Sequence, residues 1–243
     1  MLPRWVEMME RLRTVTFSSR GSQPVRLEGR FHLVADQGQW PAAVICHPHP
    51  LGGGTMHNKV VAAIARGLVS RGVLALRFNF RGVGESGGAH DYGRGEQADV
   101  AGALDWLLEQ PQVDPWRVSF VGYSFGAWVG LSHAQADPRV VAVAAVGLPA
   151  WTYDATFSRR KPPPLLGAGD IWQYDPNFLK SFTRPKLFVA GEYDAFAPPQ
   201  SLQRFVSQLP PPTVQHVLPG TDHFLAGHEV EAGQLVASFL SEL

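Results

Sequence analysis

The apolar positions of this chain fall into short runs whose spacing switches between that of strands and that of helices. Two runs rich in β-forming residues come first, at 14–17 and 25–34. Strand and helix candidates then alternate, which is the pattern of a parallel sheet with crossover helices. The predicted strands are 42–46, 73–79, 118–121, 140–146, 186–190 and 213–218, and the predicted helices are 59–71, 94–109, 125–135, 200–208 and 229–243.

The run 140–146 contains only Val and Ala, so it predicts a strand covered on both faces. Helices must then flank both sides of the sheet. A short amphipathic helix is also expected over 5–12, with Trp5, Met8, Met9 and Leu12 packed on the body. Neither an internal repeat nor a linker divides the chain. The prediction is one α/β domain over residues 1–243.

Residues 148–182 interrupt the alternation of strands and helices. They include the run Pro162-Pro163-Pro164 and are too long for an ordinary connection in a compact α/β domain. Asp175 and Pro176 resemble a helix start, so a short helix is expected to close the segment. The segment leaves the carboxyl end of the strand 140–146, so it is expected to lie over the active site as a short cap-like excursion. Its aromatic residues either pack it onto the body or wall a substrate pocket, and the pocket candidates are Trp151, Tyr153 and Trp172.

Composition narrows the choice of protein class and of partner. Of the 243 residues, 45% are hydrophobic and 17% are charged, which excludes a charged disordered tail and a coiled coil. The 21 Lys and Arg residues balance the 21 Asp and Glu residues, so the chain has no net positive charge that would attract phosphate groups. Neither nucleic acid nor an anionic membrane is therefore expected as a partner, and the ligand should be a small neutral molecule.

Cys46 is the only cysteine, which excludes an internal disulfide and a thiolate zinc site. No apolar run has the length of a signal peptide core or of a membrane span. The expected location is therefore the cytoplasm.

The pattern G-x-S-x-G occurs twice, around Ser124 and around Ser86. It carries chemistry only where a strained turn between a strand and a helix exposes the serine hydroxyl. Ser124 fits, because the strand 118–121 precedes it and the helix 125–135 follows it. Ser86 lies in a glycine-rich stretch that predicts a loop. Ser124 is therefore the predicted nucleophile.

A serine nucleophile needs a histidine base, and the base needs an orienting acid. In this order of elements both partners should follow the serine, with the acid first. His223 lies just beyond the last predicted strand and is the predicted base, with His228 in reserve. The other downstream histidines, His133 and His216, fall inside a helix and a strand.

Asp194 is the predicted acid, because it lies in the loop that leaves the strand 186–190. Glu192 in the same loop is its rival. Asp222 adjoins His223 in sequence but should point away from the imidazole ring.

Negative charge on the substrate carbonyl oxygen requires N–H donors. The Phe125 N–H, which follows the nucleophile at a helix start, is the expected first donor. The second should come from the loop His47-Pro48-His49-Pro50-Leu51, where the prolines have no N–H. This leaves His49 or Leu51. A metal site on His47, His49 and His57 is not expected, because no acidic residue is interleaved with them.

With these residues the sequence resembles the α/β-hydrolase superfamily, and the resemblance covers Val25 to Leu243. The elbow 122–126, Asp194 in Gly-Glu-Tyr-Asp and His223 in Asp-His-Phe match the nucleophile, acid and base in order. Within the superfamily it looks like the small bacterial hydrolases related to dienelactone hydrolases, which carry the motifs found at 47–50, 53–56 and 77–84. Dienelactone hydrolases use a cysteine nucleophile, whereas Ser124 stands at the elbow here. The resemblance implies an eight-stranded, mostly parallel sheet, helices on both faces and carboxylic ester hydrolysis.

The predicted function is therefore that of a serine carboxylesterase for short- to medium-chain esters, without a metal or other cofactor. A thioesterase, a peptidase or a perhydrolase could use the same three residues. A non-catalytic binding protein on the same fold is the alternative outside the enzyme class. A homodimer is possible, and the sequence leaves the oligomeric state open.

Overall fold

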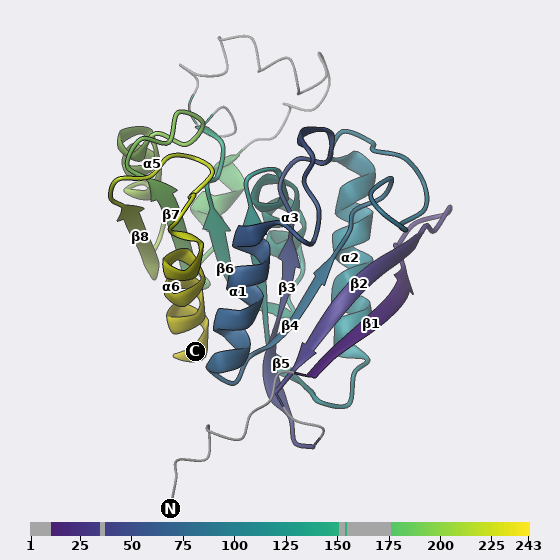
Figure 1. The fold of residues 1–243 in the computed structure, drawn as a ribbon. Helices are drawn as coiled ribbons and strands as arrows, with labels where there is room; N and C mark the ends of the chain where they lie inside the picture. Colours follow the sequence, from purple (N-terminus) through teal and green to yellow (C-terminus); the bar gives the residue numbers. More distant parts are fainter. Residues whose placement is uncertain (1–10, 35–36, 151–153, 155–175) are drawn as a thin grey trace, which may run out of the picture.

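The computed structural model describes residues 11–34, 37–150, 154 and 176–243, and it centres on an eight-stranded sheet (Figure 1). The strand order is β1-β2-β4-β3-β5-β6-β7-β8. The strands are β1 (Arg11–Ser18), β2 (Arg26–Leu33), β3 (Trp40–Cys46), β4 (Leu74–Phe78), β5 (Val113–Tyr123), β6 (Val140–Val146), β7 (Lys186–Gly191) and β8 (Thr213–Leu218).

The sheet is mostly parallel, as predicted. β1 pairs with β2, and β2 with β4, in antiparallel register. The remaining pairs, from β4 across to β8, are all parallel. The carboxyl ends of β3, β5, β6, β7 and β8 therefore meet at one edge, where the loops that follow them can come together.

Helices cover both faces of the sheet, as the apolar run of β6 predicts (Figure 1). The helices α1 and α6 pack on one face with Ile45, Val121 and Val189. The helices α2, α3 and α5 pack on the other face with Val44, Phe120 and Phe188. Their bounds are α1 (Lys59–Ser70), α2 (Arg94–Leu108), α3 (Phe125–Ala136), α5 (Pro199–Val206) and α6 (Glu229–Ser241). The described part of the chain contains no helix that is both long and apolar enough to cross a membrane.

The structure corrects the predicted first helix at its carboxyl end. Arg11 and Leu12 belong to β1, where they pair with Leu33 and His32. Residues 5–10 of that prediction lie outside the described residues. β5 also begins five residues earlier than expected, because Val113 pairs with Trp40 across an irregularity in the register.

The connections in the described part of the chain include the short 3₁₀ helices η2 (Pro50–Gly52) and η4 (Pro176–Ser181). η4 gives the short helix that was expected to close the segment 148–182. It is a 3₁₀ helix, and Asp175, the predicted cap, lies outside the described residues.

Candidate active site

Ser124 stands at a sharp turn between β5 and α3, as its G-x-S-x-G context predicts. β5 ends at Tyr123 and α3 begins at Phe125. The backbone of Ser124 has φ 54° and ψ −116°, a conformation that non-glycine residues rarely adopt. The Ser124 N–H donates to the Val146 carbonyl at 2.8 Å, and its carbonyl accepts the Trp128 N–H at 3.1 Å. These two bonds keep Ser124 in this strained conformation, which costs about 1–3 kcal/mol. Such strain is concentrated at functional sites.

The glycines on either side of Ser124 are required by close backbone contacts. A Cβ atom on Gly122 would collide with the backbone of Ala127. A Cβ atom on Gly126 would collide with the carbonyls of Cys46 and His47. The start of α3 therefore packs directly against the end of β3 and the loop that follows it.

The structure brings the predicted nucleophile, base and acid into one hydrogen-bonded chain. The Ser124 Oγ lies 2.9 Å from the His223 Nε2. The His223 Nδ1 lies 2.9 Å from Asp194 Oδ2 and 3.0 Å from Oδ1. His223 is 7% exposed and Asp194 is 2% exposed, whereas Ser124 is half-buried. An imidazole facing a buried carboxylate at Nδ1 presents Nε2 to the hydroxyl, which is the arrangement that activates a serine.

Two backbone amides hold the Asp194 carboxylate. The N–H groups of Phe196 and Ala197 donate to Oδ1 at 2.9 and 2.7 Å. This is the local turn that an aspartate makes with amides two and three residues onward. These donors were not predicted, although an aspartate at the start of a turn is a signal for them.

Contacts from β5 and the loops fix His223 itself. The Tyr123 hydroxyl donates to the His223 carbonyl at 2.8 Å. The Phe196 ring lies 4.7 Å from the imidazole centroid to centroid. Gly147 approaches the same ring, because a Cβ there would lie 3.1 Å from the His223 Cε1. None of these three contacts was predicted, since they join residues that are far apart in the chain.

The rival serine and acids have other partners. Ser86 is buried, and its hydroxyl donates to the Asn79 carbonyl at 2.7 Å and accepts the Glu28 N–H at 3.1 Å. Glu192 accepts the Gly220 N–H at 2.8 Å. Asp222 accepts the N–H of Phe224 at 2.9 Å, so it faces its own turn.

The remaining downstream histidines have other surroundings. His228 precedes α6 as its N-cap residue, and its Nδ1 lies 3.3 Å from the Ala226 carbonyl. His133 lies within α3, with its Nε2 3.6 Å from Asp137. His216 is exposed on β8.

The two candidates for the second oxyanion donor differ in their hydrogen bonds. The Leu51 N–H donates to the Nδ1 of His49 at 3.1 Å, so it is engaged within the loop. Within the described residues the His49 N–H has no such partner. The His49 ring packs on the Phe125 ring, with centroids 4.8 Å apart. The loop backbone at His49 therefore stands beside the start of α3.

The histidines of this loop do not gather around a common point. His47 is buried, with Nδ1 2.6 Å from the Pro48 carbonyl and Nε2 accepting the Phe80 N–H at 3.1 Å. His57 is exposed. Burial lowers the pKa of His47 and of His49 to about 4. Among the described side chains, no group of three His, Cys, Asp or Glu could hold a metal ion.

The predicted pocket aromatics Trp151, Tyr153 and Trp172 lie outside the described residues. Their place in a pocket stays a prediction.

Comparison with known proteins agrees with this architecture. The family model for X-Pro dipeptidyl-peptidases (S15 family) matches residues 25–173, more than half of the chain. An uncharacterised protein of Rickettsia prowazekii is 31% identical over 220 residues, which are 88% of this chain and 84% of that protein.

Solved structures agree as well. An α/β serine hydrolase without a lid from Xanthomonas campestris superposes with a TM-score of 0.72 at 27% identity, over 95% of this chain and 94% of that one. A protein of unknown function from Agrobacterium tumefaciens superposes with a TM-score of 0.73 at 31% identity, over 95% of each chain. The closer kinship with the dienelactone-hydrolase-related group stays a prediction. The chain belongs to the α/β-hydrolase superfamily, and within it to the S15 family of serine hydrolases.

Proposed function

We propose that the protein is a serine carboxylesterase in which Ser124 is the nucleophile, His223 the general base and Asp194 the orienting acid. The observation that carries the proposal is the continuous chain from Ser124 Oγ through His223 to the Asp194 carboxylate, with contacts of 2.9 Å on each side of the imidazole. A serine hydroxyl is a poor nucleophile at neutral pH without such a base. The strained, glycine-flanked turn that exposes the hydroxyl supports the same assignment.

The reaction proceeds in two steps on these residues. Ser124 Oγ attacks the ester carbonyl while His223 Nε2 takes its proton, and the proton then passes to the alcohol as the ester C–O bond breaks. Water attacks the resulting acyl-serine with His223 again as base, which releases the carboxylic acid and restores Ser124. Asp194 keeps the imidazole in the tautomer with N–H at Nδ1 and stabilises its positive charge in each step.

The oxyanion hole in this proposal consists of the N–H groups of Phe125 and His49. Phe125 opens α3, so its N–H has no partner within the helix. His49 is chosen over Leu51 because the Leu51 N–H is already bonded to the His49 ring. Both donors are fixed before substrate arrives, and such preorganisation is a large part of the rate acceleration of acyl transfer.

The acyl group in this proposal is short to medium in length. A segment of about 35 residues after β6 can wall a pocket but is short for the large cover that an emulsified lipid requires. Each added methylene should gain at most ~0.8 kcal/mol until the pocket is full. Turnover of p-nitrophenyl esters should then peak at or below about eight acyl carbons.

Amide hydrolysis is the second candidate, because the family model that matches the chain describes X-Pro dipeptidyl-peptidases. The same three residues could attack a peptide carbonyl. A single panel separates the candidates: p-nitrophenyl butyrate, the matched thioester, and an X-Pro p-nitroanilide, each with the wild-type chain and Ser124→Ala.

We expect the ester to be turned over fastest and Ser124→Ala to be inactive on every substrate. A fluorophosphonate probe should label wild-type Ser124. Preferred cleavage of the anilide would overturn the esterase in favour of the peptidase. Absence of both turnover and labelling would overturn catalysis by Ser124 altogether.

A further inference from the structure

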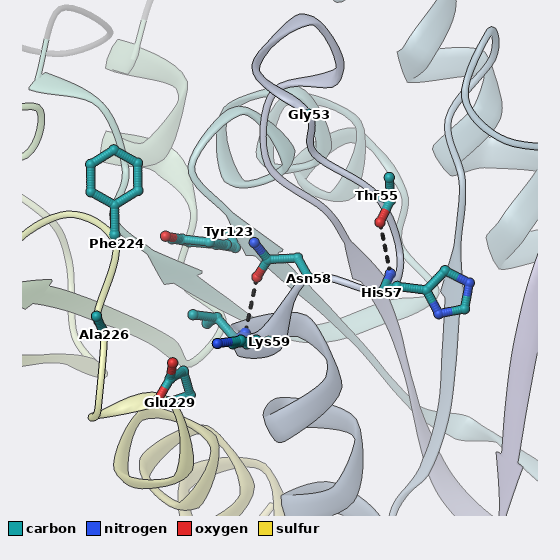
Figure 2. Close-up of a pocket in the computed structure, with 10 residues that line it drawn as sticks. Gly53, Thr55, His57, Asn58, Lys59, Tyr123, Phe224, Ala226 and Glu229 are labelled. Atoms are coloured by element: carbon teal, nitrogen blue, oxygen red, sulfur yellow. Dashed lines mark hydrogen bonds between the residues drawn. The ribbon is translucent and has the colours of Figure 1, made fainter.

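A pocket of about 480 Å³ is lined by residues that neighbour Ser124 and His223 in the sequence (Figure 2). Tyr123, which precedes Ser124, and Phe224, which follows His223, both line it. Its opposite wall is the chain from Gly53 to Lys59, which continues from the loop that contains His49. The volume is in the range of small-molecule sites.

The position of the pocket determines which half of an ester it could bind. In the proposed reaction the leaving alcohol takes its proton from the His223 Nε2, so the alcohol must lie beside His223. The Phe224 ring contacts the imidazole with centroids 5.9 Å apart, and Tyr123 bonds to the His223 carbonyl. Both residues line the pocket, so the pocket adjoins the histidine that protonates the alcohol in the proposed reaction.

The hydrogen-bonding groups of the pocket favour a ligand with many hydroxyls. Asn58 caps α1, and its Oδ1 accepts the N–H groups of Val60 and Val61 at 2.9 and 3.4 Å. The cap fixes the orientation of the amide, so its NH₂ group is the end that faces Tyr123 across the pocket (Figure 2). Thr55 Oγ1 accepts the His57 N–H at 3.1 Å, which leaves its O–H to donate.

The charged and polar side chains of the pocket favour a neutral, polar alcohol. Lys59 and Glu229 line it with opposite charges, and neither is in an ion pair among the described residues. The two opposite charges offset one another, so the pocket has no net charge that would favour an anionic or a cationic alcohol. An alkyl alcohol would bury the Asn58 and Thr55 donors without partners, which is unfavourable. Hydroxyl groups both donate and accept, so they can pair with all four side chains.

Phe224 adds an apolar surface, since its ring is 64% exposed at the rim. The carbon face of a sugar ring could cover it while its hydroxyls face the polar wall. We propose that this pocket binds the alcohol half of the ester and selects a polyhydroxylated alcohol of about the size of a sugar. This inference rests on the proposed esterase function and specifies its substrate class.

The test compares two esters that share a butyryl group and differ only in the alcohol: 6-O-butyrylglucose and cyclohexylmethyl butyrate. Both form the same acyl-enzyme, so any difference in kcat/KM arises before the alcohol leaves. We expect the wild-type chain to prefer the sugar ester. Asn58→Asp retains the cap, because Asn and Asp cap helices equally well, but removes the NH₂ donors. It should lower kcat/KM for the sugar ester by roughly threefold to tenfold and lower it much less for the cyclohexylmethyl ester.

Glu229→Gln should likewise lower kcat/KM for the sugar ester. Glu231→Gln is its matched control, since Glu231 lies on the same helix outside the pocket lining. Equal turnover of both esters by the wild-type chain, or equal effects of Asn58→Asp on both, would overturn the pocket assignment and leave the esterase intact. Failure of both esters together with absent fluorophosphonate labelling of Ser124 would overturn the esterase, and the pocket assignment with it.

Discussion

The carbonyl oxygen of Cys46, at the end of β3, occupies the space that a Cβ atom on Gly126 would need. This contact joins the loop that carries His49 to the first turn of α3, where Ser124 and Phe125 lie. The two N–H groups of the proposed oxyanion hole come from these two segments. The distance between them is therefore set by a glycine that donates no hydrogen bond to the substrate.

Gly126→Ala should separate the two segments and damage catalysis. Forcing a methyl group into a packed site costs about 1–3 kcal/mol, and a misplacement of about 1 Å can lower turnover by ~10²-fold. Stopped-flow turnover and urea unfolding of the variant measure both effects. Gly52→Ala is the control, because a Cβ there would only make ordinary contact with His49. Wild-type turnover by Gly126→Ala would contradict this account.

Ser124→Ala and Ser86→Ala should have opposite effects on activity and stability. Ser124→Ala should lower ester turnover by at least ~10³-fold, because the three residues act as one unit. Ser86→Ala should retain turnover but lose about 1–3 kcal/mol of unfolding free energy, since it leaves the Asn79 carbonyl and the Glu28 N–H without their partner. Steady-state assays and urea titrations of both variants provide the measurement. Loss of turnover in the folded Ser86 variant would refute the assignment of the nucleophile.

Asp194→Asn should lower kcat far more than Glu192→Gln. Asparagine can still accept the N–H groups of Phe196 and Ala197 through its oxygen, so the turn survives while the charge facing His223 is lost. In the best-studied serine triad the equivalent change costs ~10⁴-fold. Glutamine at 192 can still accept the Gly220 N–H, so Glu192→Gln should leave kcat almost unchanged. Comparable losses in the two variants would remove Asp194 as the acid.

The parts of the fold that were predicted correctly are those that local sequence determines. The strand Val140–Val146 has the predicted bounds, since an apolar run bounded by turn residues leaves little choice of limits. The strand Thr213–Leu218 also has the predicted bounds, because Pro212 and Pro219 stand on either side of it. Arg11 and Leu12 were assigned to a helix instead, because their place is decided by pairing with β2, which local periodicity does not report.

The candidate site divides in the same way. Ser124, Asp194 and His223 could be singled out, because each follows a predicted strand at the edge where the loops meet. The Tyr123 bond to the His223 carbonyl and the approach of Gly147 to the imidazole could not, because both join loops that only the finished sheet brings together. The choice between His49 and Leu51 likewise needed the hydrogen bond between them.

Both ring nitrogens of His47 are engaged in a way that only the neutral imidazole allows. Nδ1 faces the Pro48 carbonyl and so carries the proton, while Nε2 accepts the N–H of Phe80. A proton on Nε2 would break the second bond. Burial, which disfavours the charged form, lowers the pKa of His47 from 6.5 to about 4, against a smaller opposing effect of the Pro48 carbonyl.

The protein should therefore lose stability as the pH falls from about 6.5 to 4. In this window the unfolded chain binds a proton at His47 and the folded one does not, so protons favour unfolding. For a shift from 6.5 to about 4 the loss at pH 5 is about 2 kcal/mol relative to pH 7. His49, whose pKa burial also lowers to about 4, adds in the same direction. His47→Gln retains an acceptor for the Phe80 N–H but does not titrate. Urea unfolding of this variant at pH 7 and pH 5 should therefore show a loss of unfolding free energy that is about 2 kcal/mol smaller than in the wild-type chain. Equal pH dependence in the variant and the wild-type chain would show that His47 is not the group that takes up the proton on unfolding.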